Sequence, residues 1–287
     1  MKAFYSLAIR QLIMFAILLL FFLSDVRAQS LGYDRVVHLK KSTVRILING
    51  HASGTGFIVS DQGMVITCFH VIEPALRLGV KTEAEFPSGE KVELNVFNYF
   101  LQSGVREALG DDCCLLIFAK KPQTQFEYLN VGSFNDVQEG DQIYTIGYPL
   151  SIKQPFISMG ILSTKWIQSN HFTYMSKVDS LDRDVAWIDV TMNRGNSGGP
   201  VIKIGSTLAE DKVIGISTFI LNPYGPVAEQ LATSISTSNM DMLINGISQN
   251  KVTQLFAEAI ANNSIGVSGC ISIDHIKTIA RQGKIIK

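Results

Sequence analysis

This sequence contains little cysteine and shows no excess of either charge. Its four cysteines include no C-x-x-C pair and no Cys/His cluster with the spacing of metal ligands. We therefore expect no zinc site and no other metal or cofactor. The 25 basic residues balance the 25 acidic residues. Because no basic block stands out, we do not expect the chain to bind nucleic acid or an anionic membrane surface.

The positions of the cysteines leave two interpretations open. Cys68 stands two residues before a histidine, and Cys113 and Cys114 directly follow an aspartate. Together with Cys270 they allow three complete disulfide pairings, and the sequence does not choose between them. We expect the first three to be buried free thiols that act as small hydrophobic side chains. The alternative is a disulfide between Cys68 and one of the adjacent pair.

Residues 1–28 have the layout of a secretory signal peptide. Lys2 and Arg10 give a positive start, Leu12 to Leu23 form an apolar core, and a small residue, Ala28, ends a cleavage site. The apolar core is short for a membrane span, so an uncleaved anchor is the less favoured alternative. We expect an exported protein, periplasmic or secreted, that has no stable membrane association after cleavage.

The part of the chain that follows is predicted to be all-β. Short runs rich in β-branched and other apolar residues alternate with Gly, Ser, Asp and Asn turns, as in a barrel or sandwich. Two halves can be drawn at a polar turn, residues 31–137 and residues 138–248. Residues 249–287 are expected to form a short helical C-terminal extension, because apolar residues recur there at helical spacing: Val252, Leu255, Phe256, Ala259 and Ile260.

Three residues in the order His, Asp, Ser carry the candidate chemistry. Ser197 lies in the string Gly-Asn-Ser-Gly-Gly-Pro, His70 follows an apolar run, and Asp112 opens another one. A serine hydroxyl needs a neighbouring base, a histidine can supply it, and a buried carboxylate fixes the imidazole tautomer. We assign Ser197 as nucleophile, His70 as general base and acid, and Asp112 as the residue that orients His70. Asp111 is the competing candidate for that last role.

The glycines around Ser197 predict an oxyanion hole. Glycine lets a chain turn sharply and approach a substrate closely. Such a turn can aim the backbone N–H groups of Gly195 and Ser197 at the negative charge that develops during attack on a carbonyl group.

The motifs together resemble the trypsin-like serine proteases, most closely their bacterial HtrA-like branch. The resemblance covers about residues 40–245 and rests on five segments: Gly54–Phe57, Thr67–Val71, Asp112–Leu116, Ile146–Pro149 and Asp189–Pro200. It implies two packed six-stranded antiparallel β-barrels, with the active site between them. It also implies hydrolysis of peptide bonds through an acyl-enzyme.

The sequence departs from that family at several positions. Asn196 replaces the aspartate with which digestive relatives capture a new amino terminus, which argues against that kind of zymogen activation. Arg194 replaces a usual proline, and Cys68 and Cys114 replace small residues. HtrA-like enzymes commonly carry a PDZ domain, for which residues 249–287 leave no room.

The resemblance also places four candidate substrate-binding residues. Thr191 should lie near the base of the first specificity pocket, and Thr218 should be a hydrogen-bond partner of the buried aspartate. Phe219 and Ile220 should line the bound substrate strand. Because no acidic residue stands at Thr191, a preference for small or medium aliphatic side chains is expected rather than one for Lys or Arg.

The sequence thus predicts an exported serine endopeptidase that acts on proteins or peptides and whose oligomeric state stays open. A catalytically latent, protease-like binding module is the alternative. An esterase of the α/β-hydrolase class is a weaker option, because the chain order differs and the serine follows β-strands.

Overall fold

The computed structural model describes the greater part of the two predicted halves. Within the described residues no helix combines the length and apolar character that crossing a membrane requires. The predicted signal peptide, residues 1–28, and Asp111 lie outside them. The described residues are 31–97, 112–166, 172–174, 177–179, 184–220, 227, 230–234, 243–244, 246–261, 266–274 and 276–277.

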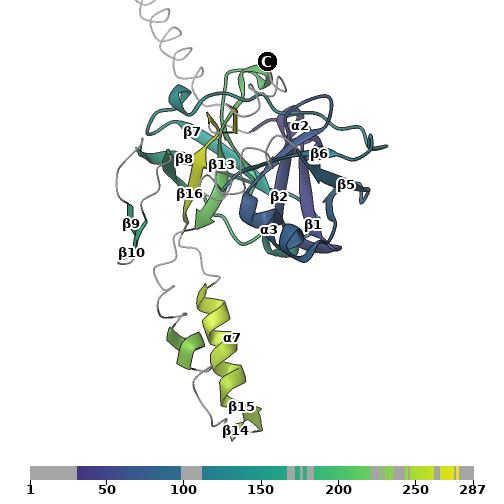
Figure 1. The fold of residues 1–287 in the computed structure, drawn as a ribbon. Helices are drawn as coiled ribbons and strands as arrows, with labels where there is room; N and C mark the ends of the chain where they lie inside the picture. Colours follow the sequence, from purple (N-terminus) through teal and green to yellow (C-terminus); the bar gives the residue numbers. More distant parts are fainter. Residues whose placement is uncertain are drawn as a thin grey trace, which may run out of the picture. The chain divides into compact units, whose positions relative to one another are not determined.

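The first half folds into a closed six-stranded antiparallel barrel, drawn in purple to blue in Figure 1. The strand order is β1-β2-β3-β6-β5-β4, and β4 closes the barrel on β1. Helix α2 (Tyr33–Lys41) precedes the barrel and helix α3 (Phe69–Leu78) follows its third strand. The strands are β1 (Thr43–Ile48), β2 (His51–Ile58), β3 (Met64–Thr67), β4 (Thr82–Glu85), β5 (Lys91–Val96) and β6 (Cys114–Phe118).

The order of buried and exposed residues shows how the strands of this barrel face its core. In β5, exposed and buried residues alternate, as expected of a strand with one face toward the core. In β1, five successive residues are buried, so both of its faces are covered. Arg45 of β1 is buried as well, and its Nε donates to Glu85 Oε2 of β4 at 2.7 Å. A buried charge needs such a partner, and this pair lies across the β1–β4 seam.

A second closed antiparallel barrel has the order β11-β16-β13-β12-β7-β8. The prediction of two six-stranded barrels is therefore confirmed. The core of this barrel includes Phe134, Ile143, Ile188 and Ile214. Its strands are β7 (Gln142–Gly147), β8 (Phe156–Trp166), β11 (Val185–Asp189), β12 (Pro200–Lys203), β13 (Lys212–Ile220) and β16 (Val267–Ser272).

The second barrel extends beyond the predicted range 138–248 at both ends. Strand β16 lies in the segment expected to be a helical extension, yet it pairs with both β11 and β13. Before residue 138, Val131 bridges to Val213, and Phe134 and Val137 belong to the core of the second barrel. A glycine and two serines within β16 weaken its strand signal, so tertiary pairing decides its structure.

Helix α7 (Gln249–Ala261) confirms helical structure in the expected extension. It contacts β15 (Ile247–Ser248), which pairs with β14 (Leu243–Ile244). A second small ladder joins β9 (Phe172–Tyr174) to β10 (Lys177–Asp179). Three short 3-10 turns complete the described elements: η1 (Phe134–Asp136), η2 (Pro149–Ser151) and η3 (Leu208–Glu210).

All four cysteines are buried free thiols. The thiol interpretation is therefore confirmed over the disulfide between Cys68 and Cys113 or Cys114. Burial raises the pKa of the Cys114 thiol above its usual range, and it raises that of Cys270 to about 12. These two thiols remain protonated and pack as small hydrophobic side chains.

Candidate active site

Strand pairing in the first barrel brings His70 and Asp112 together. His70 is the second residue of α3, directly after β3, and Asp112 stands two residues before β6. Strands β3 and β6 pair side by side, with Thr67 opposite Cys114. The end of β3 and the start of β6 are thus neighbours although they are far apart in sequence.

The carboxylate of Asp112 holds His70 at two points. The ring Nδ1 lies 2.8 Å from Oδ2 and 3.0 Å from Oδ1, and the backbone N–H of His70 donates to Oδ1 at 3.0 Å. Because a carboxylate only accepts, Nδ1 carries the proton and Nε2 is left as the basic nitrogen. Asp112 has φ +47°, a left-handed conformation that aspartate tolerates better than most residues. This geometry suits the role expected of Asp112, which is to orient the imidazole of His70.

The side chains of His70 and Asp112 differ in solvent exposure, as base catalysis requires. The Asp112 side chain is 15% exposed, whereas that of His70 is 49% exposed. The carboxylate is therefore shielded, and the imidazole remains open to a substrate.

Ser197 lies on the loop between β11 and β12 of the second barrel. Its carbonyl accepts from the N–H of Thr55 in β2, at 2.9 Å, and the next N–H, of Gly198, donates to Ser217 O at 2.7 Å. A Cβ on Gly198 would lie 2.2 Å from Thr67 Oγ1 and 3.0 Å from the backbone nitrogen of Cys68. Only glycine lets the serine loop approach the β3–α3 junction, which carries His70, so closely.

The Ser197 hydroxyl has a different partner from the one a triad requires. Its Oγ donates to the carbonyl of Thr218 over a long 3.5 Å, and among the described residues it forms no hydrogen bond to His70. Catalytic hydrogen bonds commonly tighten only when substrate binds. The loop is in place; the nucleophile–base hydrogen bond is not formed.

The backbone before Ser197 has the form of an oxyanion hole. The N–H of Asn196 donates to Asn193 O at 3.0 Å, and Gly195 has φ +99°, so residues 193–196 form a type II turn. The carbonyl of Arg194 accepts from the N–H of Leu150 at 2.7 Å. In a trans peptide the carbonyl and the N–H point in opposite directions, so the Gly195 N–H points away from Leu150.

Two donors are consequently left without acceptors. Within the described part of the chain, neither the N–H of Gly195 nor that of Ser197 makes a hydrogen bond. The carbonyl of the Asn196–Ser197 peptide is held in turn by the N–H of Gly199 at 2.9 Å. A pair of free, pre-oriented N–H groups is what stabilisation of an oxyanion demands.

Thr55 is a site residue that the sequence reasoning did not identify. Its Oγ1 donates to Gly195 O at 2.6 Å and accepts from the N–H of Tyr148 at 3.0 Å, while its own N–H binds Ser197 O. The side chain is fully buried. A threonine between two glycines beside apolar residues was the available signal, since a buried hydroxyl needs partners.

The structure describes the side chains of only two of the four candidate substrate-binding residues, Thr191 and Thr218. Thr191 is exposed, whereas Phe219 and Ile220 end β13 and their side chains lie outside the described part. Thr218 does not bond to Asp112 as expected. Its hydroxyl donates to Ile216 O at 3.0 Å and lies 3.6 Å from the thiol sulfur of Cys68.

The two unusual residues of the serine loop differ in environment. Arg194 is exposed and Asn196 is buried. Asn196 Oδ1 has no hydrogen-bond partner within the described residues, and it lies where a Cβ on Gly147 would come within 2.6 Å. Its amide thus fills the space between the serine loop and the end of β7.

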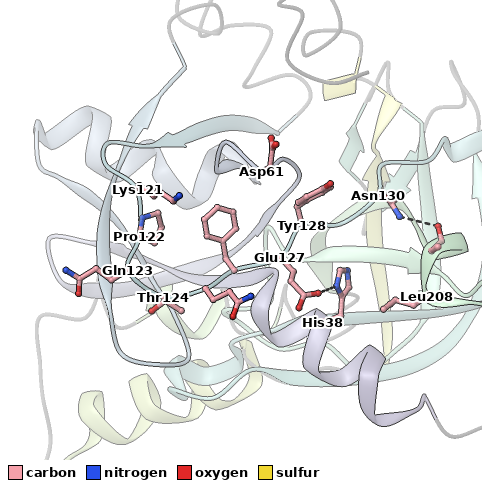
Figure 2. Close-up of a pocket in the computed structure, with 13 residues that line it drawn as sticks. His38, Asp61, Lys121, Pro122, Gln123, Thr124, Glu127, Tyr128, Asn130 and Leu208 are labelled. Atoms are coloured by element: carbon pink, nitrogen blue, oxygen red, sulfur yellow. Dashed lines mark hydrogen bonds and ion pairs between the residues drawn. The ribbon is translucent and has the colours of Figure 1, made fainter.

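A separate cavity of about 750 Å³ lies along the connection between the barrels (Figure 2). None of the three candidate catalytic residues lines it. His38 of α2 binds Glu127 of the connection there, and Asn130 Nδ2 donates to Ala209 O at 3.2 Å. The cavity is therefore a feature of the inter-barrel connection and not part of the candidate active site.

Comparison with known proteins places these residues in a wider context. Residues 54–216 match the family described as trypsin-like peptidase domain. Serine protease HTRA4 of Mus musculus is 28% identical over 186 residues, which cover 64% of this chain and 34% of the relative. A probable periplasmic serine endoprotease DegP-like of Rickettsia conorii is 27% identical over 172 residues, 60% of this chain and 29% of the relative.

A solved structure has the same fold. The HtrA-type protease AlgW with decapeptide matches with a TM-score of 0.55 and 15% identity, over 87% of this chain and 66% of that one. The chain spans about a third of the length of the curated relatives that it matches.

Proposed function

Since this chain belongs to the trypsin-like peptidase family, we propose that it is an exported serine endopeptidase that cleaves proteins or peptides through an acyl-enzyme on Ser197. The observation that carries the proposal is the joint placement of a carboxylate-held imidazole and a serine loop with two free N–H donors. The names of the relatives, serine proteases and endoproteases, support the same activity.

The proposed reaction assigns each group a task. Ser197 Oγ attacks the peptide carbonyl while His70 Nε2 takes its proton, and Asp112 stabilises the imidazolium that forms. The N–H groups of Gly195 and Ser197 bind the oxyanion. His70 then protonates the leaving amine, and a water molecule, activated by the same nitrogen, hydrolyses the acyl-enzyme.

Two finer features belong to the proposal. Export to the periplasm or beyond is supported by the layout of residues 1–28 and by relatives named periplasmic. A preference for small or medium aliphatic residues before the cleaved bond is supported by an uncharged Thr191. The solved structure of AlgW, an HtrA-type protease with a decapeptide, supports peptides or proteins as the substrate class.

Digestion of an unfolded protein substrate, with the products identified by mass spectrometry, tests the proposal. We expect cleavage mainly after aliphatic residues, and none by the Ser197→Ala variant. An Asp112→Asn variant should retain the fold and lose about 10⁴-fold in kcat, as expected when the histidine tautomer is wrong. Equal cleavage by wild type and Ser197→Ala would overturn the proposal, and cleavage chiefly after Arg would overturn its specificity.

A further inference from the structure

The thiol of Cys68 lies directly beside the His70–Asp112 pair. Cys68 is fully buried, and its Sγ is held by Ser217 O at 3.3 Å and Thr218 Oγ1 at 3.6 Å. One ligand atom from each of Cys68, His70 and Asp112 lies within 4.8 Å of the others. Linear spacing did not reveal this group, because Asp112 lies 42 residues from His70 in the sequence.

These three atoms form a zinc-type donor set. Thiolate, imidazole and carboxylate are the side chains that bind Zn²⁺, at about 2.0–2.3 Å, and three protein ligands leave a fourth tetrahedral position open. Two ligands of a tetrahedral ion at such distances lie roughly 3.5 Å apart. The Nδ1–Oδ2 separation of 2.8 Å must therefore widen slightly, and the sulfur, which lies within 4.8 Å of the other two atoms, must approach by up to about 1.3 Å. A thiolate ligand disfavours Mg²⁺ and Ca²⁺.

We propose that Cys68, His70 and Asp112 form an inhibitory binding site for a thiophilic divalent cation, for which Zn²⁺ is the natural probe. The ion takes the place of the proton between His70 Nδ1 and Asp112. The thiol loses its proton to solvent, and the imidazole proton moves from Nδ1 to Nε2. The nitrogen that should act as base then carries a proton and has no lone pair to accept another.

The ion can reach this position from the imidazole side. The side chain of His70 is half exposed, whereas Asp112 is largely shielded and the fully buried sulfur forms the closed end of the site. Within the described residues no other cysteine joins such a group. Cys114, equally buried and two residues after Asp112, is therefore a matched control.

Titration of the full chain with Co²⁺, a spectroscopic substitute for Zn²⁺, tests the site without reference to activity. We expect one Co²⁺ per chain, a thiolate-to-cobalt absorption band, displacement by Zn²⁺ and release of a proton. The same should hold for Cys114→Ala and for Ser197→Ala. Cys68→Ala should lose the band and bind Zn²⁺ more than about 100-fold more weakly, a larger loss than that of an outer partner. His70→Ala should also weaken binding.

Inhibition of peptide hydrolysis provides a second readout. This readout rests on the proposed function, whereas the metal titration does not. Zn²⁺ should inhibit wild type and Cys114→Ala reversibly, with recovery after chelation, and should spare Cys68→Ala relative to its own rate without metal. Absence of the band in folded wild type, or an unchanged Zn²⁺ affinity in Cys68→Ala, overturns the site. If Cys68→Ala does not fold, Cys68→Ser serves in its place. A chain that binds Co²⁺ through Cys68 but cleaves nothing refutes the proposed function and leaves the metal site standing.

Discussion

Thr55 shows how one buried side chain can organise an active site. Its hydroxyl and N–H together fix the carbonyls of Gly195 and Ser197, and it accepts a hydrogen bond from the backbone of Tyr148. None of these groups is a reacting atom. Thr55 is thus a positioning residue for the oxyanion loop, and it connects the first barrel to the second.

Thr55→Val removes the hydroxyl and preserves the shape of the side chain. We expect kcat to fall on the order of 10²-fold, as when one oxyanion donor is lost, while KM changes little, because the interaction matters most in the transition state. Thr55→Ser should restore most of kcat. Steady-state kinetics of the three proteins, with thermal unfolding as a control, makes the comparison. A valine variant with normal kcat, or a serine variant as slow as valine, would contradict the role.

Local sequence signatures pointed to some of the residues that the structure brings together. His70 follows one apolar run and Asp112 opens another, and the structure places the two side chains in contact. Thr55, Leu150 and the position of Cys68 could not be predicted, because their roles depend on segments that approach from distant parts of the chain.

Strand β16 illustrates the same limit for a whole element. It closes the second barrel between β11 and β13, yet its sequence, Val-Ser-Gly-Cys-Ile-Ser, has a glycine and two serines. Local propensity offered no reason to separate it from the helical segment α7. The pairing partners supply the stabilisation, and they lie far earlier in the sequence.

Two side-chain truncations to alanine distinguish strand β16 from helix α7 in the segment predicted as a helical extension. Ile271 in β16 is buried, and Leu255 in α7 is 54% exposed. Ile271→Ala should lower the free energy of unfolding by about 2–5 kcal/mol, and Leu255→Ala should change it by about 0.5 kcal/mol or less. Denaturant titration measures both. Equal small effects would mean that β16 is not part of the barrel core.

The contact between α2 and the inter-barrel connection predicts that the stability of the fold falls in acid. The hydrogen bond from His38, helped by Lys41, lowers the pKa of Glu127 below its usual 4.5. A lowered carboxyl pKa stabilises the fold above about pH 4.5, and that contribution is lost as the pH falls through the folded-state pKa. Because Glu127 is partly exposed, the effect is screened.

Glu127→Gln should therefore reduce stability at neutral pH and flatten its decline below about pH 4.5. Denaturation midpoints measured between about pH 3 and pH 7 provide the comparison. Glu73→Gln, which removes an exposed carboxylate 3.7 Å from Arg77, is the control and should leave the acid slope close to that of wild type. An unchanged slope in Glu127→Gln would show that the His38–Glu127 contact does not form in solution.

Across the whole molecule, the candidate site is divided between the barrels. The first barrel supplies His70 and Asp112, and the second supplies Ser197 with its N–H donors. The bond from Thr55 N–H to Ser197 O and the contacts of β2 with β7 join the two parts. The all-β class could be predicted from short strands and turns, and the two barrels from the resemblance of the ordered motifs to trypsin-like proteases. The partner of the Ser197 hydroxyl, Thr218 O, could not be predicted, since the contact depends on how β13 approaches the serine loop.

Reaction of the purified protein with a fluorophosphonate probe tests most directly whether Ser197 is an activated nucleophile. Such a probe modifies a serine only when a base activates it and an oxyanion site receives the phosphoryl oxygen. We expect labelling of the wild type at Ser197, mapped by mass spectrometry, no labelling of Ser197→Ala, and severe loss of labelling in His70→Ala. A folded wild-type protein that remains unlabelled would contradict the assignment of Ser197, His70 and Asp112 as a working triad.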